Sequence, residues 1–87
     1  MPRYVSQHTL ACLTRQGAEQ LSKKIHASTA VSAKRVLVNM HEGKMLVEFD
    51  AGGREELEKW FAMEKFHFDW LIRIEWESTA DGSLKPV

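Results

Sequence analysis

Apolar and polar residues alternate most regularly between Lys34 and Asp50. Two strand-like runs flank Glu42-Gly43 there, and a short loop with glycine between such runs predicts a β-hairpin. With a two-residue loop, one side of the hairpin would carry only apolar pairs: Met40–Met45, Val38–Val47 and Val36–Phe49. The other side would carry a mixed set: Leu37, Asn39, His41, Lys44, Leu46 and Glu48. We therefore predict one core-facing side and one mixed side, and we expect any function on the mixed side.

Two segments with helical periodicity lie on either side of the hairpin, from Arg15 to Ala27 and from Arg54 to about Glu64. Apolar residues recur in both at helical spacing: Ala18, Leu21 and Ile25 in the first, Leu57, Trp60 and Phe61 in the second. Thr14 precedes the first segment and is the predicted N-cap, because its hydroxyl can accept a free backbone N–H of the first turn.

Strand-like segments are predicted at both ends of this region. Arg3 to Leu13 alternates loosely, and neither side of it is clearly the apolar one, so its core-facing side stays open. In Phe68 to Glu77 a nearly unbroken apolar set is predicted to face the core: Trp70, Ile72, Ile74 and Trp76. The residues between them would face outward: Leu71, Arg73 and Glu75. Ser78 to Val87 has little to bury and predicts a loose tail.

The predicted order is strand, helix, strand, strand, helix, strand. An α+β protein of the ferredoxin-like βαββαβ kind satisfies this order, with a four-stranded antiparallel sheet and both helices on one face. A hairpin meander with a helix at one end is the alternative. Because two domains in 87 residues would each be very small, we predict one ferredoxin-like domain at 1–77 and a flexible C-terminal tail at 78–87.

Three short motifs accompany this order: Pro2-x-Tyr4-Val5, Thr14-x-x-Gly17 and the run from Glu42 to Ala51. In layout and in these motifs the chain resembles small bacterial ferredoxin-like proteins of the GYD and DUF4242 groups. The Gly-Tyr-Asp triplet of the first group is absent, and Glu42-Gly43-Lys44 stands in its place. The resemblance implies a dimer that pairs sheet to sheet as a dimeric α+β barrel with a cavity at the open face. It also implies a possible nickel site, since some DUF4242 relatives bind nickel.

Composition narrows the classes of function. Basic and acidic residues number 12 each, so the formal net charge at pH 7 is zero with neutral histidines. No nucleic-acid partner is expected, because phosphate recognition usually requires a basic surplus. Cys12 is the single cysteine, which excludes an intrachain disulfide. The amino-terminal residues contain no apolar signal segment or membrane span, so we expect a cytoplasmic protein without a membrane partner.

The predicted mixed side carries leucines among ionisable groups, whereas a solvated sheet face is usually more uniformly polar. We therefore predict a homodimer through this open face, and a non-catalytic module that binds a small ligand or a partner there without a cofactor. The predicted ligand-binding or interface residues are Leu37, Asn39, Leu46, Glu48, Leu71, Arg73 and Glu75. Isolated exposed leucines without a function are the alternative.

Two other functions stay open. A cofactor-free enzyme of the oxygenase or isomerase type would use His8, Arg73 and Glu48, provided that His8 faces the open side. In the alternative interpretation, Arg73 forms an ion pair with Glu48 or Glu75 at the dimer interface, which sets the register of the dimer and does no chemistry. A nickel-type site would draw on His8, His67 and Asp69. Because the other histidines lack close ligand spacing, surface or structural histidines are expected instead of a metal site.

Overall fold

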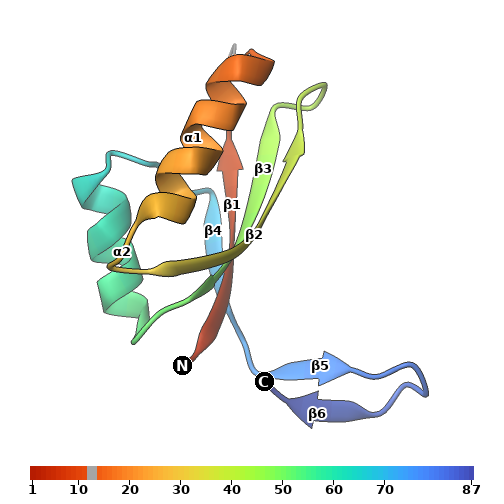
Figure 1. The fold of residues 1–87 in the computed structure, drawn as a ribbon. Helices are drawn as coiled ribbons and strands as arrows, with labels where there is room; N and C mark the ends of the chain where they lie inside the picture. Colours follow the sequence, from red (N-terminus) through yellow and green to blue (C-terminus); the bar gives the residue numbers. More distant parts are fainter. Residues whose placement is uncertain (12–13) are drawn as a thin grey trace.

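The computed structural model describes residues 1–11 and 14–87, and its architecture is α+β. The elements are β1 (Arg3–Thr9), α1 (Arg15–Ala27), β2 (Ser32–Asn39), β3 (Lys44–Asp50), α2 (Arg54–Met63), β4 (Trp70–Ile74), β5 (Trp76–Ser78) and β6 (Leu84–Pro86). Four strands form an antiparallel sheet in the order β2-β3-β1-β4, and β5 and β6 form a separate two-stranded sheet. The four-stranded sheet with its two helices is compatible with a ferredoxin-like arrangement (Figure 1), and the β5–β6 hairpin is an addition to it.

Both predicted helices are confirmed. α1 has the predicted bounds, and the Thr14 hydroxyl accepts the backbone N–H of Gly17 at 3.1 Å, so the predicted N-cap is present. α2 begins at the predicted residue and ends at Met63, and its apolar stripe is buried. The predicted first strand is shorter, because β1 ends at Thr9. Cys12 and Leu13, at the end of that prediction, lie outside the described residues.

The C-terminal end of α2 is a Schellman motif. Phe66 N–H donates to the carbonyl of Phe61 at 2.9 Å, and Lys65 N–H donates to that of Ala62 at 3.2 Å. The rings of Phe61 and Phe66 pack edge to face at 5.9 Å, which is the apolar contact that accompanies this motif. Lys65 occupies the left-handed position, with φ of 53°, where glycine is usual.

The β2–β3 hairpin keeps its predicted faces but not its predicted register. The observed pairs are Val38–Met45, Leu37–Leu46 and Val36–Val47, two residues away from the prediction. The turn spans 40–43 because the Asn39 side chain accepts the N–H of Glu42 at 3.0 Å and Gly43 adopts a left-handed φ of 66°. A shift of two residues preserves the alternation of side chains. Met40, predicted in the core, is instead 42% exposed.

The core-facing side of β4 is the opposite of the predicted one. Leu71 is 5% exposed, whereas Ile72 is 52% exposed. Leu71 lies opposite Ser6 of β1, and Ser6 belongs to the side that the helices cover. The nearly unbroken apolar set therefore predicted the wrong side, because pairing with β1 and not the apolar pattern determines which side of β4 meets the helices. Trp76 is outside this sheet, because β4 ends at Ile74.

The core lies between the two helices and one face of the four-stranded sheet. Its buried apolar residues are Tyr4, Ile25, Val31, Met45, Val47, Phe49, Ala51, Leu57, Trp60, Phe61 and Leu71. Ser6 and His8 are buried with them. The core-facing side of β1, which the sequence left open, therefore contains two polar residues beside Tyr4.

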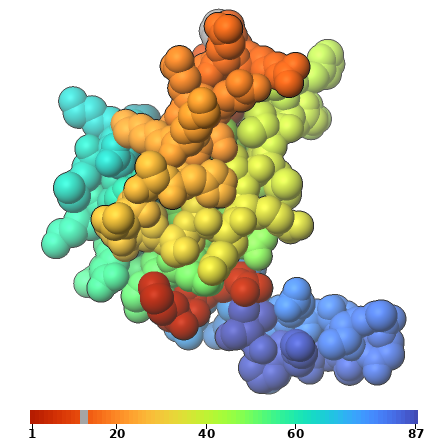
Figure 2. Space-filling view, viewed as in Figure 1, coloured from red at the N-terminus to blue at the C-terminus, as the bar shows by residue number. Residues whose placement is uncertain are grey.

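The predicted loose tail contains regular structure. Residues 76–86 form the β5–β6 hairpin, which spans the predicted boundary between the domain and the tail. In Figure 1 this hairpin leaves the lower end of the main sheet and extends away from both helices. Figure 2 shows it as a projection beside the body of the molecule.

Candidate binding face of the sheet

The face of the main sheet that the helices leave uncovered is called the open face here. Its residues are Arg3, Val5, Gln7 and Thr9 of β1, Arg35, Leu37 and Asn39 of β2, Lys44, Leu46, Glu48 and Asp50 of β3, and Trp70, Ile72 and Ile74 of β4. The strand registers align these residues in rows. One row is Leu37, Leu46, Gln7 and Trp70, and the next is Arg35, Glu48, Val5 and Ile72.

Large apolar side chains of the open face are exposed. Leu37 is 47% exposed, Trp70 is 37% exposed and Ile72 is 52% exposed. Val5 and Leu46 lie between them at intermediate exposure. Scattered apolar residues on a surface are ordinary, but in these two rows each of the four strands contributes a large apolar side chain, and such a gathering is typical of an interaction site.

Charged side chains of alternating sign lie among the apolar side chains of the open face. The Glu48 carboxylate accepts the Nε–H of Arg35 at 3.2 Å and lies 3.7 Å from the guanidinium of Arg3. Asp50 lies 3.7 Å from Arg3 and 3.2 Å from the Lys34 ammonium. Arg3 Nε is shielded from solvent and has no hydrogen-bond partner among the described residues. The charges of this network alternate in sign, although the Nε–H of Arg3 makes no hydrogen bond within it.

A polar cluster lies at the opposite end of the open face. Asp69 accepts hydrogen bonds from the Thr9 hydroxyl at 2.7 Å and from the Gln7 amide at 3.2 Å. Lys44 Nζ donates to the Thr9 hydroxyl at 2.9 Å. These hydrogen bonds, first that of Thr9 and then that of Gln7, hold the pKa of the Asp69 carboxyl below its ordinary value. The carboxylate is therefore ionised, and its hydrogen bonds to Thr9 and Gln7 hold it against β1.

A hollow of about 330 Å³ adjoins this cluster on the open face. Its lining combines leucines with amide and charged groups: Gln7, Leu37, Val38, Asn39, Glu42, Lys44 and Leu46. Glu42 accepts a hydrogen bond from the Asn39 amide at 2.8 Å. An apolar floor with a few polar groups is the arrangement that small-molecule sites use.

His8 lies on the other face, under the helices, and is fully buried. Its Nδ1 is 2.7 Å from the backbone carbonyl of His67, which can only accept, so Nδ1 carries the proton. Nε2 then accepts the Ser6 hydroxyl at 2.7 Å. The imidazole stacks on Phe66, with ring centroids 3.9 Å apart, and meets the edge of Phe61 at 5.3 Å. Every polar atom of the ring is satisfied inside the core.

Burial is the main influence on the pKa of His8. Desolvation lowers the pKa below 6.5, and it outweighs the hydrogen bond to His67 and the charge of Asp69, which both act to raise it. His8 is thus neutral at pH 7 and enclosed, so a substrate on the open face cannot reach it.

The predicted catalytic candidates are not brought together. His8 is on the covered face and Glu48 is on the open face, since Glu48 lies opposite Val5. Arg73 lies opposite Tyr4, so it belongs to the covered side of the sheet, where it is exposed.

The predicted interface residues divide between the two faces. Leu37, Asn39, Leu46 and Glu48 are on the open face. Leu71 is in the core, Arg73 is on the covered side, and Glu75 is exposed between β4 and β5. Sequence reasoning missed Val5, Arg3, Trp70 and Ile72 on the open face. The register between β1 and β4 places these residues on the open face, and the loosely alternating sequence of β1 does not reveal that register.

The metal candidates do not form a site. His8 is enclosed in the core, and the Asp69 carboxylate is held by Thr9 and Gln7 on the other face. Within residues 1–11 and 14–87, no group of three His, Cys, Asp or Glu side chains is arranged to hold a metal ion.

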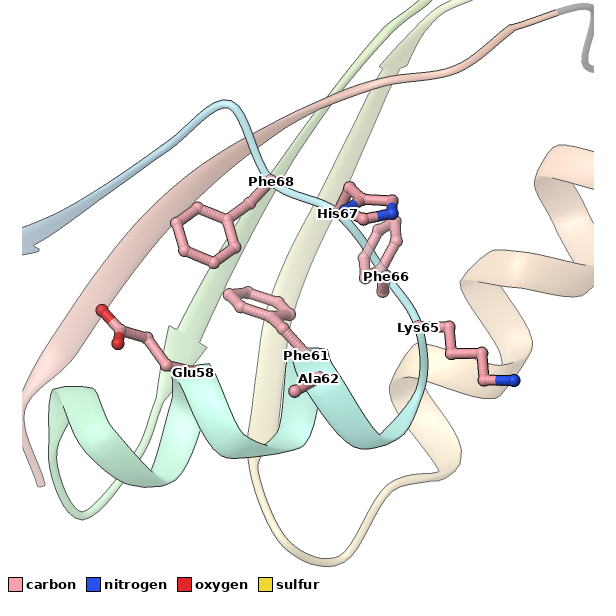
Figure 3. A pocket seen from close by; sticks show the side chains of 7 residues that line it. All are labelled: Glu58, Phe61, Ala62, Lys65, Phe66, His67 and Phe68. Carbon is pink, nitrogen blue, oxygen red and sulfur yellow. The ribbon is translucent and has the colours of Figure 1, made fainter.

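A second hollow, of about 440 Å³, lies beside the end of α2. Its lining residues are Glu58, Phe61, Ala62, Lys65, Phe66, His67 and Phe68. Figure 3 shows Phe61 rising from α2 toward Phe68 of the following connector, and the two rings pack with centroids 5.0 Å apart. Its aromatic wall belongs to the packing around His8, and the charged side chains stand at its margin.

Comparisons with protein-family models, with curated proteins and with solved structures find no match to this chain. Neither helix in the described part of the chain combines the length and the apolar character that a membrane span requires.

Proposed function

We propose that this chain is a cytoplasmic, ferredoxin-like, non-catalytic binding module that forms a homodimer through its open face. The observation that carries the proposal is the pair of adjacent rows in which Leu37, Trp70 and Ile72 stay exposed. A four-stranded sheet with helices on one face has an incomplete second layer when its other face leaves large apolar side chains in solvent. A second copy supplies that layer. The similarity to the GYD and DUF4242 groups stays a prediction.

The charges of the open face suit a second copy of the same chain. Arg3, Arg35 and Lys34 alternate with Glu48 and Asp50, so the surface carries both signs. In a two-fold interface the same patch meets itself, which requires a self-complementary surface of this kind. A net charge of zero adds no long-range repulsion between copies.

The hollow beside Asn39 and Lys44 is the place that we propose for a small ligand. It opens on the same face, so a second copy would close it from above. The enzyme hypothesis receives no comparable support, because the imidazole of His8 is satisfied and enclosed on the covered face.

The experiment compares two lysine substitutions by analytical ultracentrifugation over a range of concentrations. Ile72→Lys places a charge among the open-face apolar residues, while its 52% exposure leaves the fold of one chain intact. We expect the dimer Kd to rise at least about a hundredfold, because a buried charge would be left without a partner. Small carboxylic acids are titrated into the wild-type protein and into the Ile72→Lys variant. Shifts in the backbone amide signals of Asn39 and Lys44 then show whether a ligand binds in the hollow.

Met63→Lys is the matched control. Met63 is 75% exposed at the end of α2, far from the open face in the layers of the fold, and we expect the wild-type Kd for this variant. A wild-type protein that sediments as a monomer at all concentrations would refute the homodimer. An equal effect of the two substitutions would refute the open face as its interface.

A further inference from the structure

The two edges of the main sheet differ in how far this chain covers them. β4 is the shorter edge strand, with five residues, and Arg54 Nη1 of α2 donates to the carbonyl of Leu71 on it at 2.8 Å. β2 is the other edge strand and has eight residues (Figure 1). Among the described residues, β3 alone forms backbone hydrogen bonds with β2. The outer side of β2 therefore presents unpaired N–H and C=O groups, which are a template for another strand.

An apolar groove of about 250 Å³ lies beside this edge, between α1 and β2. Its apolar lining consists of one residue of α1 and three of the hairpin: Ala18, Val36, Val38 and Met40. Val38 is 39% exposed and Met40 is 42% exposed. Arg15 and Glu19 of α1 also line the groove, and they pair with each other at 3.2 Å. Because side chains alternate along a strand, a strand added to β2 would place every second side chain over this groove.

The charge along β2 changes from basic to acidic. Lys34 and Arg35 lie near its beginning, and Glu42 lies in the turn that follows its end. Lys34 is 3.2 Å from Asp50 of the open face. Glu42 accepts a hydrogen bond from Asn39 of the same face at 2.8 Å. The opposite charges at the two ends of β2 therefore lie toward the same face of the sheet, and only valine and leucine lie between Arg35 and Asn39.

This order of charges favours a second copy of the same chain as the added strand. In an antiparallel pair with a two-fold axis, residues at equal distances from the centre meet, and Lys34 and Glu42 are each four residues from Val38. A pair centred near Val38 therefore brings Lys34 of each copy beside Glu42 of the other. The axis is perpendicular to the sheet, so the helices of both copies stay on one side. The Val38 and Met40 side chains of each copy then meet the groove of the other.

We propose that two copies of this chain pair antiparallel along their β2 edges, so that their main sheets form one continuous sheet of eight strands. This inference goes beyond the open-face homodimer, because it uses a different surface and does not depend on that dimer. The two contacts are compatible, since edge pairing leaves both open faces uncovered on the same side. Together they build a tetramer. The edge pair is its weaker contact, because it involves one strand of each copy.

The test exchanges the charges at the two ends of β2 in the full chain. Every protein also carries Ile72→Lys, which removes the open-face contact, and analytical ultracentrifugation at low ionic strength measures the remaining association. Glu42→Lys sets bases against bases at both ends of the pair, and Lys34→Glu sets acids against acids. We expect each variant alone to raise the Kd at least about tenfold, because like charges repel twice in one pair. In an equimolar mixture of the two variants every charge meets its opposite, so association is expected to return.

Lys59→Glu is the matched control, because it reverses one charge at an exposed position on α2, away from β2. Its Kd should equal that of Ile72→Lys alone. Recovery in the mixture is an effect between chains, so local destabilisation of one variant would not produce it.

The outcomes separate the edge pair from the open face. If the wild type dimerises and Ile72→Lys stays monomeric at all concentrations, the edge pair is overturned and the open face stands. Charge variants with an unchanged Kd, or a mixture that associates no better than its components, also overturn the edge pair. If Ile72→Lys associates as tightly as the wild type and the mixture recovers, the edge pair is supported and the open face is overturned. A wild-type monomer overturns both proposals.

Discussion

The two faces of the main sheet are built from the same strands, but the helices of this chain cover only one of them. On β1, Tyr4, Ser6 and His8 face the helices and are buried, whereas Val5 and Gln7 face outward. On the covered face, even the buried His8 has a hydrogen-bond partner for each ring nitrogen, within a packed aromatic cluster. The open face leaves aliphatic and aromatic groups in solvent beside a network of ion pairs.

This difference shows that polarity alone does not distinguish a functional residue from a structural one. His8 looks like a catalytic candidate in the sequence, yet Ser6 and His67 occupy both of its nitrogens. Ile72 looks like a core residue, yet it is exposed on the open face. Whether a polar group has hydrogen-bond partners, or an apolar group is buried, depends on its neighbours in space, and this distinguishes the two kinds of residue better.

The largest expected effect is on the covered face. His8→Ala removes two hydrogen bonds and two ring contacts, and it leaves a cavity, so we expect a loss of about 3 kcal/mol in the free energy of unfolding. Gln7→Ala, one position along on the open face, should cost less than about 1 kcal/mol. Urea unfolding at one low protein concentration measures both. Similar losses for the two variants would remove the contrast between the faces.

The pH dependence of stability tests the same contrast. The pKa of His8 is lowered in the folded state, so below about pH 6.5 the unfolded chain binds a proton that the folded chain does not. Stability is therefore fully present above the unfolded pKa and falls as the pH drops toward the folded pKa.

We expect the wild type to be less stable at about pH 5 than at about pH 7.5, and His8→Phe combined with Ser6→Ala to reduce this difference. Chemical denaturation at both pH values is the measurement. An unchanged pH profile in the double variant would show that other groups dominate the acid sensitivity.

The smallest expected effect concerns the turn that completes the covered face. Lys65 has a left-handed φ of 53°, so Lys65→Gly should increase the free energy of unfolding by about 0.5–1 kcal/mol. Lys59→Gly, at an exposed position inside α2, should decrease it by about 1 kcal/mol. Thermal unfolding distinguishes the two signs. The dimer Kd should not change in either variant. That result would show that the stability of the covered face and association through the open face are independent.

The local patterns of the chain predicted the helices well. Thr14 caps α1 as expected, and Leu57, Trp60 and Phe61 are buried as expected, because capping and helical periodicity act over a few neighbouring residues. The hairpin faces were predicted for the same reason. Its register was not, because the turn depends on the Asn39 side chain.

The candidate site was predicted only on β2 and β3. Leu37 and Leu46 lie on the open face as expected, but the opposite side of β4 was chosen, so Trp70 and Ile72 were missed. The tail was also expected to lack structure, although Thr79 to Ser83 contains the glycine and aspartate of a tight turn.

The sequence by itself determined the two helices and the places of the four main-sheet strands, since each choice depends on contacts within a few residues. Only the tertiary structure decided which side of β1 and of β4 meets the helices. Both strands carry side chains on each side that can be buried, and a polar pair such as Ser6 and His8 becomes compatible with a core once each group finds its partner. Pairing between distant strands, which no local pattern encodes, therefore determined what the open face presents.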